Sequence, residues 1–426
     1  VVVRRTCTVR EEPVAFGCEE RFARGERLLD DPDHLAGGLR SHQVLDRLVE
    51  RAADEIGEVT EDGSGERIDV REAQVLIDEK DAEGDVVEQS LDERHPIADG
   101  FASPGARGAS EIELVVKDKA EDRVMHQLVA QTAALCDADL GQQCSRFEAA
   151  LGLSRSHVRE LALYRFPHPW IEQHMPRCYG VSENASRGVW SIAIEYLKDA
   201  ELVGAAEASG QWTPAHIDAA ICGAASIHSV WYGREDDLRA KHWVAPEITP
   251  ADAVAMTSLW RALAAFSDAF YGTWSGGVLL PLQRQFIRTI GGWWQELAAL
   301  PGTLIHNDYN PRNLAFRRGA GDCRVCVFDW ELARVGAPQH DLAELLCFVL
   351  PQGAGVEDLA RWQDLHRLEL SSRAGVAING TAWRRGFVLA LQHLAIDRLP
   401  FYALAHRFKP REYLPDRKST RLNSSH

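Results

Sequence analysis

The chain has 426 residues, of which 45% are hydrophobic and 26% charged, so it can bury a large core in two or three domains. Its net charge is −16, and most of this lies in residues 1–100, with 13 Lys and Arg against 27 Asp and Glu. That distribution, without a basic stripe, argues against binding to nucleic acid or to anionic membranes. No apolar run is long enough to cross a membrane or to direct secretion, so we expect a cytoplasmic protein.

The first hundred residues carry weak structural signals. About forty irregular residues precede a segment at 41–57 with helical apolar spacing, and we assign 1–56 to an N-terminal extension with one helix. Short alternating stretches between 57 and 110 indicate strands separated by turns. The clearest strand is EIELVVK at 111–117.

The remaining elements divide the chain into a sheet-bearing part and a helical part. Helices are predicted at 121–136 and 157–164, followed by a strand at 191–197 that closes a lobe spanning 57–197. Long helical patterns then occupy 214–231, 250–272, 280–299, 341–350, 357–370 and 382–404. The predicted fold is therefore α+β, with a second lobe at 198–415. Residues 416–426 resemble vector-derived sequence and are left out of the fold prediction.

Two short motifs in the second lobe carry the chemistry. HNDYNPRN begins at His306 and places Asp308 and Asn313 at offsets 2 and 7, and after a predicted hairpin DWE begins at Asp329. The first spacing matches the kinase catalytic loop HRDLxxxN, in which the Asp orients the attacking hydroxyl and the Asn binds metal. Asp329 stands where the metal-binding Asp of DFG would be. The pattern indicates phosphoryl transfer from ATP with Mg²⁺.

Turn formation is the alternative explanation, because Asn, Asp and Pro are common turn residues. Turn chemistry does not require a second carboxylate at the end of the following strand, so two matches in the right order favour the catalytic interpretation. His306 is better interpreted as a structural residue that holds the loop than as an acid or base.

With these motifs the chain resembles the aminoglycoside phosphotransferase and choline kinase family of small-molecule kinases. The resemblance covers about residues 95–410 and is strongest over LIHNDYNPRNLAF, VFDWELARVGAPQHDLAELL and VRELALYR. It implies a protein-kinase-like, two-lobed fold. It also implies that Glu331, the third residue of DWE, assists the metal site and that Asp341 braces the catalytic loop. Asn310 departs from the family, in which a His is common at this position.

The nucleotide site is expected in the first lobe. Strand alternation puts Val115 and Lys117 on one face, where Val115 would cover adenine and Lys117 would reach phosphate. Lys119 has the same parity and is the alternative to Lys117. The resemblance makes Glu160 the partner of this lysine, with Glu148 as the alternative.

Two further parts of the nucleotide site are less specific. The segment at 100–110 could supply a glycine-rich phosphate loop, but it lacks the GxGxxG spacing and a plain hairpin explains it equally well. Glu195, Tyr196 and Leu197 are expected to form the hinge whose backbone binds adenine.

We therefore predict a small-molecule kinase that uses ATP and Mg²⁺ and acts on a hydroxylated small-molecule partner. A protein kinase and a catalytically silent pseudokinase are the alternatives. Five tryptophans, among them Trp260 and Trp294, could form a cage for a cationic substrate, but their helical spacing is more typical of core packing.

Overall fold

A computed structural model describes residues 2–9, 110–203, 212–272, 275–318, 323–351 and 353–408. Several predicted features lie outside these residues: the helix at 41–57, the strands between 57 and 109, the glycine-bearing segment up to residue 109, the turn of the hairpin at 319–322, and the tail at 416–426.

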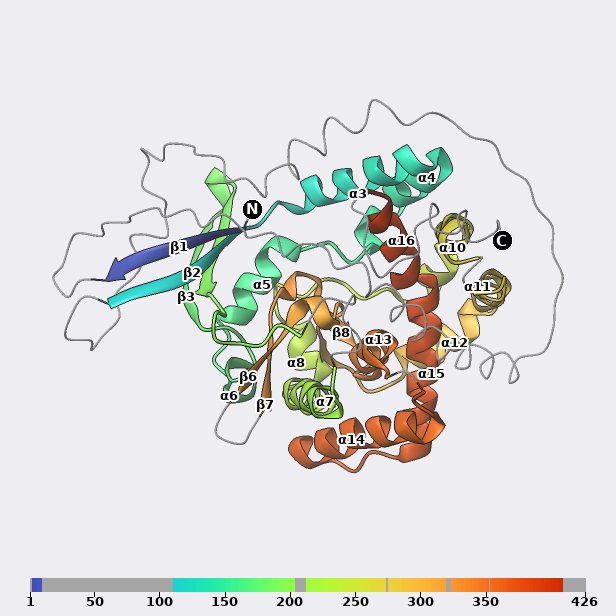
Figure 1. The fold of residues 1–426 in the computed structure, drawn as a ribbon. Coiled ribbons are helices and arrows are strands. Elements are labelled where there is room, and N and C mark those ends of the chain that lie inside the picture. The colour runs from blue at the N-terminus through green and yellow to red at the C-terminus, as the bar shows by residue number, and fades with distance from the viewer. Residues whose placement is uncertain are drawn as a thin grey trace, which may run out of the picture.

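An antiparallel sheet of four strands forms the first part of the molecule (Figure 1). Its order is β1 (Val2–Val9), β2 (Ser110–Asp118), β4 (Val189–Glu195) and β3 (Cys178–Asn184). The expectation that the first forty residues are irregular is wrong for β1, whose sequence VVRRTCTV is rich in β-branched residues and pairs with β2 along its whole length. Residues 2–9 thus belong to the sheet-bearing lobe and not to an extension.

The two faces of β2 have different surroundings. Leu114 and Val116 point to one side and are buried with Ala193 of β4. Val115 and Lys117 point to the other side, where Val115 packs with apolar residues of β4 and of helix α5 (Ser156–Tyr164). Strand alternation therefore brings Lys117 to the face that helix α5 covers.

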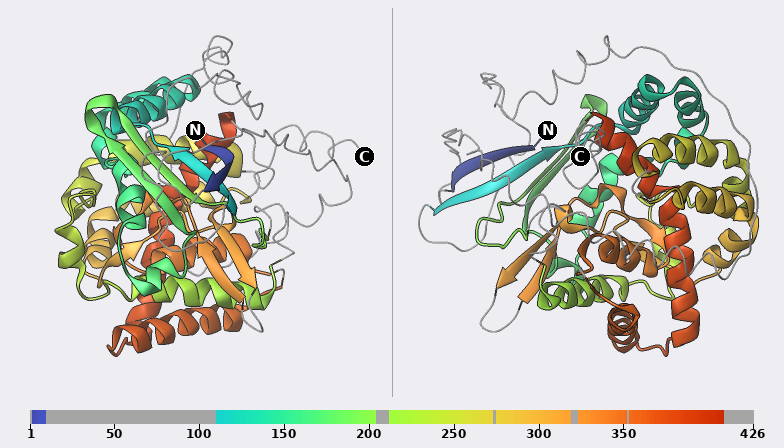
Figure 2. Two further views of the ribbon diagram at one scale, coloured as in Figure 1. Left: turned by 90° about the vertical axis from the view of Figure 1, so that its left-hand side faces the viewer. Right: turned by 45° about the vertical axis from the view of Figure 1, so that its right-hand side comes forward.

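Two helices inserted after β2 pack away from the sheet. Helix α3 (Asp122–Cys136) and helix α4 (Ala138–Arg146) lie beside the helices of the second lobe in Figures 1 and 2. Leu140 of α4 is fully buried in one apolar cluster with Leu259 and Trp260 of the second lobe. The predicted lobe at 57–197 therefore does not pack as one unit, because its helical insertion shares the core of the other lobe.

The second lobe is mostly helical. Its helices are α7 (Pro214–His228), α8 (Glu235–Arg239), α9 (Pro250–Ala255), α10 (Thr257–Tyr271), α11 (Leu279–Arg288), α12 (Ile290–Ala298), α13 (Gln339–Val349), α14 (Val356–Ala374), α15 (Gly380–Ile396) and α16 (Arg398–Phe408), and the short α6 (Pro169–Glu172) precedes them. Two antiparallel strand pairs lie among them: β5 (Thr303–Ile305) with β8 (Arg334–Gly336), and β6 (Leu314–Arg318) with β7 (Cys323–Val327).

Three predicted helices, 250–272, 280–299 and 382–404, are each divided in two. Between α11 and α12 the hydroxyl of Thr289 donates to the carbonyl of Gln285 at 3.0 Å, and two glycines follow. Between α15 and α16 the cause is Pro400, whose ring would clash with the carbonyl of Ile396 in a continuous helix. Apolar periodicity continues across both breaks and therefore could not reveal them.

The described tryptophans of the second lobe belong to its core, whereas Trp274, another candidate for the cage, lies outside the described residues. Trp260, Trp293 and Trp294 are buried, and each indole N–H donates to a backbone carbonyl. The core-packing interpretation is confirmed for these three. None of the described helices combines the length and apolarity that a membrane span requires.

The position of Leu140 predicts a large effect on stability. Leu140→Ala should lower the free energy of unfolding by about 2–5 kcal/mol, because it opens a cavity in the cluster that joins α4 to the second lobe. Leu128→Ala on α3 is the matched control, since Leu128 is 46% exposed, and it should change stability by less than about 1 kcal/mol. Urea denaturation measures both, and equal effects would contradict the packing of α4 against the second lobe.

Candidate active site

The loop that follows β5 is held by one carboxylate of α13. Asp341 accepts hydrogen bonds from the backbone N–H groups of His306 at 2.6 Å and Asn307 at 2.9 Å. It lies in the first turn of α13, where the helix dipole favours a negative charge. His228 of α7 contacts the same carboxylate at 3.1 Å. The resemblance implied this bracing position for Asp341, whereas His228 was not predicted.

The brace supports a strained backbone. Asn307 has a φ of 61°, in the left-handed region that disfavours most side chains. The ring of His306 contacts the carbonyl of Phe328 at 3.0 Å, and this contact joins the loop to the segment just before Asp329. His306 is 1% exposed and so lies away from solvent. This position suits the predicted structural role.

Asp308 is oriented by the side chains of its own loop. The amide nitrogen of Asn313 donates to Asp308 Oδ2, and that of Asn310 donates to Oδ1, both at 2.8 Å. This use of its nitrogen leaves the side-chain oxygen of Asn313 as the end available to a cation. Asn310, which departs from the family pattern, thus serves to position the carboxylate.

A second set of groups reaches Asp308 from the last described helix. Arg398, the first residue of α16, forms an ion pair with Asp308 Oδ1, and the Tyr402 hydroxyl lies 3.2 Å from the same oxygen. Glu344 of α13 contacts Tyr402 and Arg398 and accepts the N–H of Tyr309 at 2.8 Å. Burial opposes ionisation of Asp308, but Arg398 lowers its pKa below the ordinary value.

A cluster of five charged side chains lies between the two lobes. Lys117 Nζ of β2 is 3.0 Å from Glu160 of α5 and 2.7 Å from Asp329. Lys119 contacts Glu160 and lies 2.8 Å from Glu331. Glu160 itself is fully buried. The structure thus brings together the predicted Lys117, Glu160, Asp329 and Glu331, and it adds Lys119, which had been the weaker candidate.

The lysines determine the ionisation of Asp329. Burial alone would raise the pKa of Asp329, but Lys117 and Lys119 lower it to about 2. Its backbone has a φ of 68°, so the residue is held in the left-handed region like Asn307. Strain of this kind persists only where the surrounding contacts fix it, and it is frequent at functional sites.

Arg159 positions the DWE segment and was not predicted. This fully buried residue of α5 donates to the carbonyl of Glu331 at 2.8 Å and to that of Ser154 at 2.5 Å. Glu160, the next residue, turns toward the lysines. Glu148 is exposed in a short 3-10 helix (Glu148–Ala150) and takes no part in the cluster, so it is the wrong alternative to Glu160.

The oxygen donors around Asp329 suit a hard divalent cation. Carboxylate oxygens of Glu160, Asp329 and Glu331 all lie within 4.8 Å of one another. The backbone carbonyl of Asn313 accepts the N–H of Phe328, the residue before Asp329, at 3.1 Å, and this bond joins Asn313 to the segment that carries the carboxylates. Carboxylate and amide oxygens are the ligands that Mg²⁺ uses in phosphate-binding sites. The residues present therefore fit the predicted cation.

The predicted hinge lines a pocket of about 430 Å³. Glu195, Tyr196 and Leu197 contribute to it, together with Glu113, which shares the strand face of Val115 and Lys117. The carboxylate of Glu195 is paired with Arg317. The backbone N–H of Glu195 donates to the carbonyl of Arg177 at 2.8 Å, so this N–H is not available to a ligand. Within the described residues the N–H of Leu197 has no such partner.

The part of the chain that carries these motifs matches a known protein family. A model of the phosphotransferase enzyme family (APH) matches residues 159–375, about half of the chain. No curated protein sequence matches the chain. The match begins after β2, so the position of Lys117 rests on the structure and not on the family model.

Several solved structures are loosely similar. One is a putative aminoglycoside phosphotransferase from Ralstonia eutropha JMP134, with 13% identity over 72% of this chain and 88% of the other and a TM-score of 0.39. An aminoglycoside-3'-phosphotransferase of type VIII has 15% identity over 68% and 90%, with a TM-score of 0.34. A choline/ethanolamine kinase family protein from Mesorhizobium loti has 15% identity over 76% and 86%, with a TM-score of 0.35. Likenesses at this level do not identify a substrate.

The brace on the loop predicts a stability effect. Asp341→Asn should lower the free energy of unfolding by about 1–3 kcal/mol, because the two loop N–H groups bond different oxygens of Asp341 and an amide nitrogen in place of one oxygen leaves a buried donor unpaired. Asp364→Asn, at a surface pair of α14 with Arg384, is the matched control and should change it by less than about 1 kcal/mol. Chemical denaturation compares the two, and equal stabilities would show that Asp341 does not hold the loop.

Proposed function

The chain belongs to the phosphotransferase enzyme family, and from this membership we propose that it moves the γ-phosphate of MgATP to a hydroxyl group of a small molecule. The family membership confirms the predicted resemblance and the predicted enzyme class. The use of ATP and Mg²⁺, the acceptor and the roles of individual residues are our proposal.

One observation carries the proposal. Asp329 accepts a hydrogen bond from Lys117 of the sheet-bearing lobe. Phe328, the residue before Asp329, donates its backbone N–H to Asn313, and the side chain of Asn313 donates to Asp308. A cation-binding carboxylate, a phosphate-binding lysine and a hydroxyl-orienting carboxylate are thus connected by direct contacts. Phosphoryl transfer needs these three groups in fixed relation, because its catalysis consists mainly of positioning and charge stabilisation.

The residues divide the work between two ends of the site. The hinge pocket near Leu197, with Val115 on the adjoining strand face, would take the base of the nucleotide, and Lys117 would hold its phosphates while Glu160 keeps the ammonium group in place. Asp308, fixed by Asn313, would accept a hydrogen bond from the acceptor hydroxyl and align its oxygen with the γ-phosphate.

Asp329 and Glu331, which belong to the cluster of carboxylates, would hold Mg²⁺, and Asn313 would complete the site as the motif predicts. When bound, the cation neutralises charge that develops on the β and γ phosphates. The low pKa of Asp329 keeps this ligand ionised throughout the physiological range. Burial lowers the pKa of Lys119, but Glu160 and Glu331 raise it further, so the net shift is upward. Lys119 therefore stays protonated and restrains Glu331 through their ion pair.

Replacement of Asp308 tests the proposal. Asp308→Asn should slow phosphoryl transfer by about 10² to 10⁴-fold, the usual range for a positioned base, and should leave MgATP affinity nearly unchanged. Transfer is measured as substrate-dependent ADP formation across a panel of hydroxylated compounds, and affinity by calorimetry.

Two results of that experiment would count against the proposal. Transfer that survives the substitution intact would remove Asp308 from the chemical step. An unmodified chain that binds MgATP but transfers phosphate to no compound in a broad panel would favour a pseudokinase.

The two lysines give a second test. Lys117→Ala should weaken MgATP binding at least tenfold, because a charge-assisted bond to phosphate contributes about 1.5–3 kcal/mol. Lys119→Ala is the matched control from the same cluster and should have a clearly smaller effect, because Lys119 restrains Glu331 whereas Lys117 pairs with Asp329, the carboxylate proposed to hold the cation beside the phosphates. Equal losses in the two variants, measured by calorimetry, would mean that Lys117 has no special contact with the nucleotide.

A further inference from the structure

Arg398 occupies the carboxylate that the acceptor hydroxyl must reach. It begins α16 and pairs with Asp308 Oδ1, although it lies 90 positions further along the chain. Its guanidinium also donates to Glu344 at 3.4 Å through Nε and lies over the ring of Tyr402 at 5.0 Å. Only 14% of each side chain of the Arg398–Asp308 pair is exposed, so the pair is largely withdrawn from water.

The donors around Asp308 crowd one of its two oxygens. A carboxylate offers about four acceptor positions, two on each oxygen. Oδ2 accepts from Asn313, whereas Asn310 and Arg398 donate to Oδ1, and Arg312 at 3.4 Å and the Tyr402 hydroxyl at 3.2 Å contact the same oxygen. An incoming hydroxyl that bonds Oδ1 therefore has to displace one of them. The two asparagines belong to the same short loop, whereas Arg398 reaches the carboxylate on a long side chain from another helix, so Arg398 is the group that can move.

The other anions near Arg398, Glu344 and Asp397, already have partners of their own. Glu344 already accepts the N–H of Tyr309 and contacts Tyr402. Burial and the nearby Asp308 raise the pKa of Glu344 despite the opposite effect of Arg398. Arg312 adds another positive charge, 3.4 Å from Asp308. A guanidinium that leaves Asp308 here is largely buried and, among the described residues, keeps only the longer ion pair with Glu344 at 3.4 Å, which is unfavourable.

We propose that Arg398 is a specificity-determining residue and that the acceptor is a hydroxylated anion whose own carboxylate or phosphate takes Arg398 from Asp308. The proposal rests on the proposed phosphotransferase function, because it concerns the hydroxyl that Asp308 orients. Binding of such an acceptor exchanges one ion pair for another and uncovers Asp308 in the same event. A bidentate guanidinium contact suits both carboxylate and phosphate groups.

A cationic acceptor fits this site poorly. An ammonium group near Arg398 and Arg312 would add like charge at a place that is partly shielded from solvent, where Coulombic repulsion is stronger than in water. It would also leave Arg398 with only the 3.4 Å ion pair to Glu344 once Asp308 turned to the hydroxyl. The arrangement therefore disfavours polyamine acceptors.

Two matched series of acceptors test the proposal with the full chain and MgATP. The first is glycerate, glycerol and 3-amino-1,2-propanediol, which share a vicinal diol and differ in one anionic, neutral or cationic group. The second is gluconate, sorbitol and 1-amino-1-deoxysorbitol. ADP formation and the shift in unfolding temperature are measured for each. We expect the carboxylate to bind best and the ammonium compound worst in both series.

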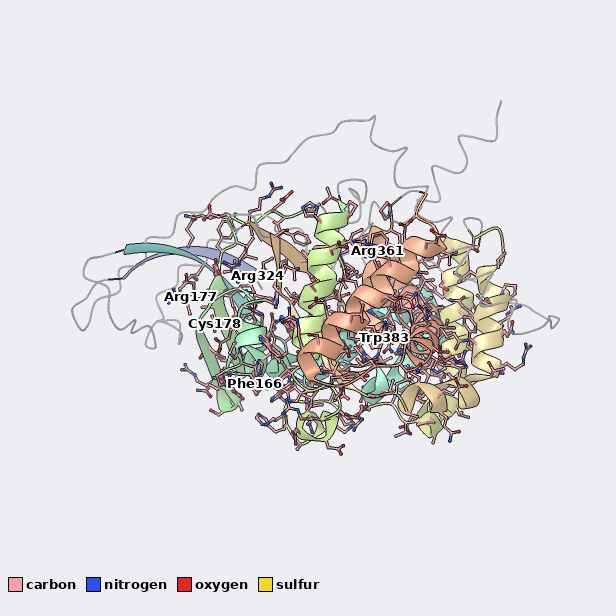
Figure 3. All side chains as sticks on the ribbon, turned by 90° about the horizontal axis from the view of Figure 1, so that it is seen from below. Phe166, Arg177, Cys178, Arg324, Arg361 and Trp383 are labelled. Carbon is pink, nitrogen blue, oxygen red and sulfur yellow. The ribbon has the colours of Figure 1, made fainter. Side chains whose placement is uncertain are left out.

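Variants assign the preference to Arg398. Arg398→Gln should weaken carboxylate binding by about 30-fold or more, as for truncation of a buried ion pair, and should remove the ranking within each series. Arg398→Lys keeps the charge and should keep the ranking with lower affinity, which guards against loss of folding as the explanation. Arg361→Gln is the matched control, because it also removes an arginine from an ion pair. Arg361 lies on α14, as Figure 3 shows, and pairs with Asp218 of α7 at 2.6 Å.

The outcomes separate this proposal from the one on which it rests. Equal or stronger binding of the ammonium compounds, no thermal shift with either carboxylate, or a ranking that survives Arg398→Gln would overturn the anionic acceptor. A thermal shift with MgATP is read in the same assay. Its absence would contradict the proposed kinase function, whatever the acceptors show.

Discussion

The buried carboxylate of Glu160 is the interaction on which the arrangement of the site depends. It is fully buried and contacts both Lys117 and Lys119, and those lysines also bond Asp329 and Glu331. A carboxylate without these cations would be strongly unfavourable at such a position, and the lysines without it would lose the group that directs them. The cluster thus joins β2, α5 and the DWE segment, which are far apart in the sequence, and fixes the sheet-bearing lobe against the catalytic loop.

Residues close in sequence were predictable, whereas partners brought in by the fold were not. The offsets within HNDYNPRN and the strand parity of Lys117 locate their side chains because backbone geometry alone fixes them. The α+β fold class follows in the same way from periodicity. Lys119, the alternative to Lys117 from strand parity, lies just beyond the end of β2, yet its side chain reaches the same cluster. Arg398 carries no motif, and only the packing of α16 brings it to Asp308.

The first lobe shows how charge and composition can hide structure. Its acidic first hundred residues gave little periodicity, yet β1 pairs with β2 residue by residue. Helices α3 and α4 follow β2 directly in the sequence but share a core with Leu259 and Trp260 of the other lobe. A chain segment is assigned to a lobe by the apolar surface it buries, and this surface becomes visible only when long-range contacts are known.

In the described state the charges at both ends of the site satisfy one another. Lys117 pairs with Asp329 at the end proposed to bind the cation, and Arg398 pairs with Asp308 at the end proposed to bind the acceptor. A ligand that binds at either end therefore has to break an ion pair. It also has to supply charged groups of its own to replace the partners that it separates. Phosphate would take Lys117 while Mg²⁺ takes Asp329, and an acceptor anion would take Arg398 while its hydroxyl takes Asp308. If both proposals hold, the acceptor is selected by its charge through the same electrostatic constraint that positions the nucleotide.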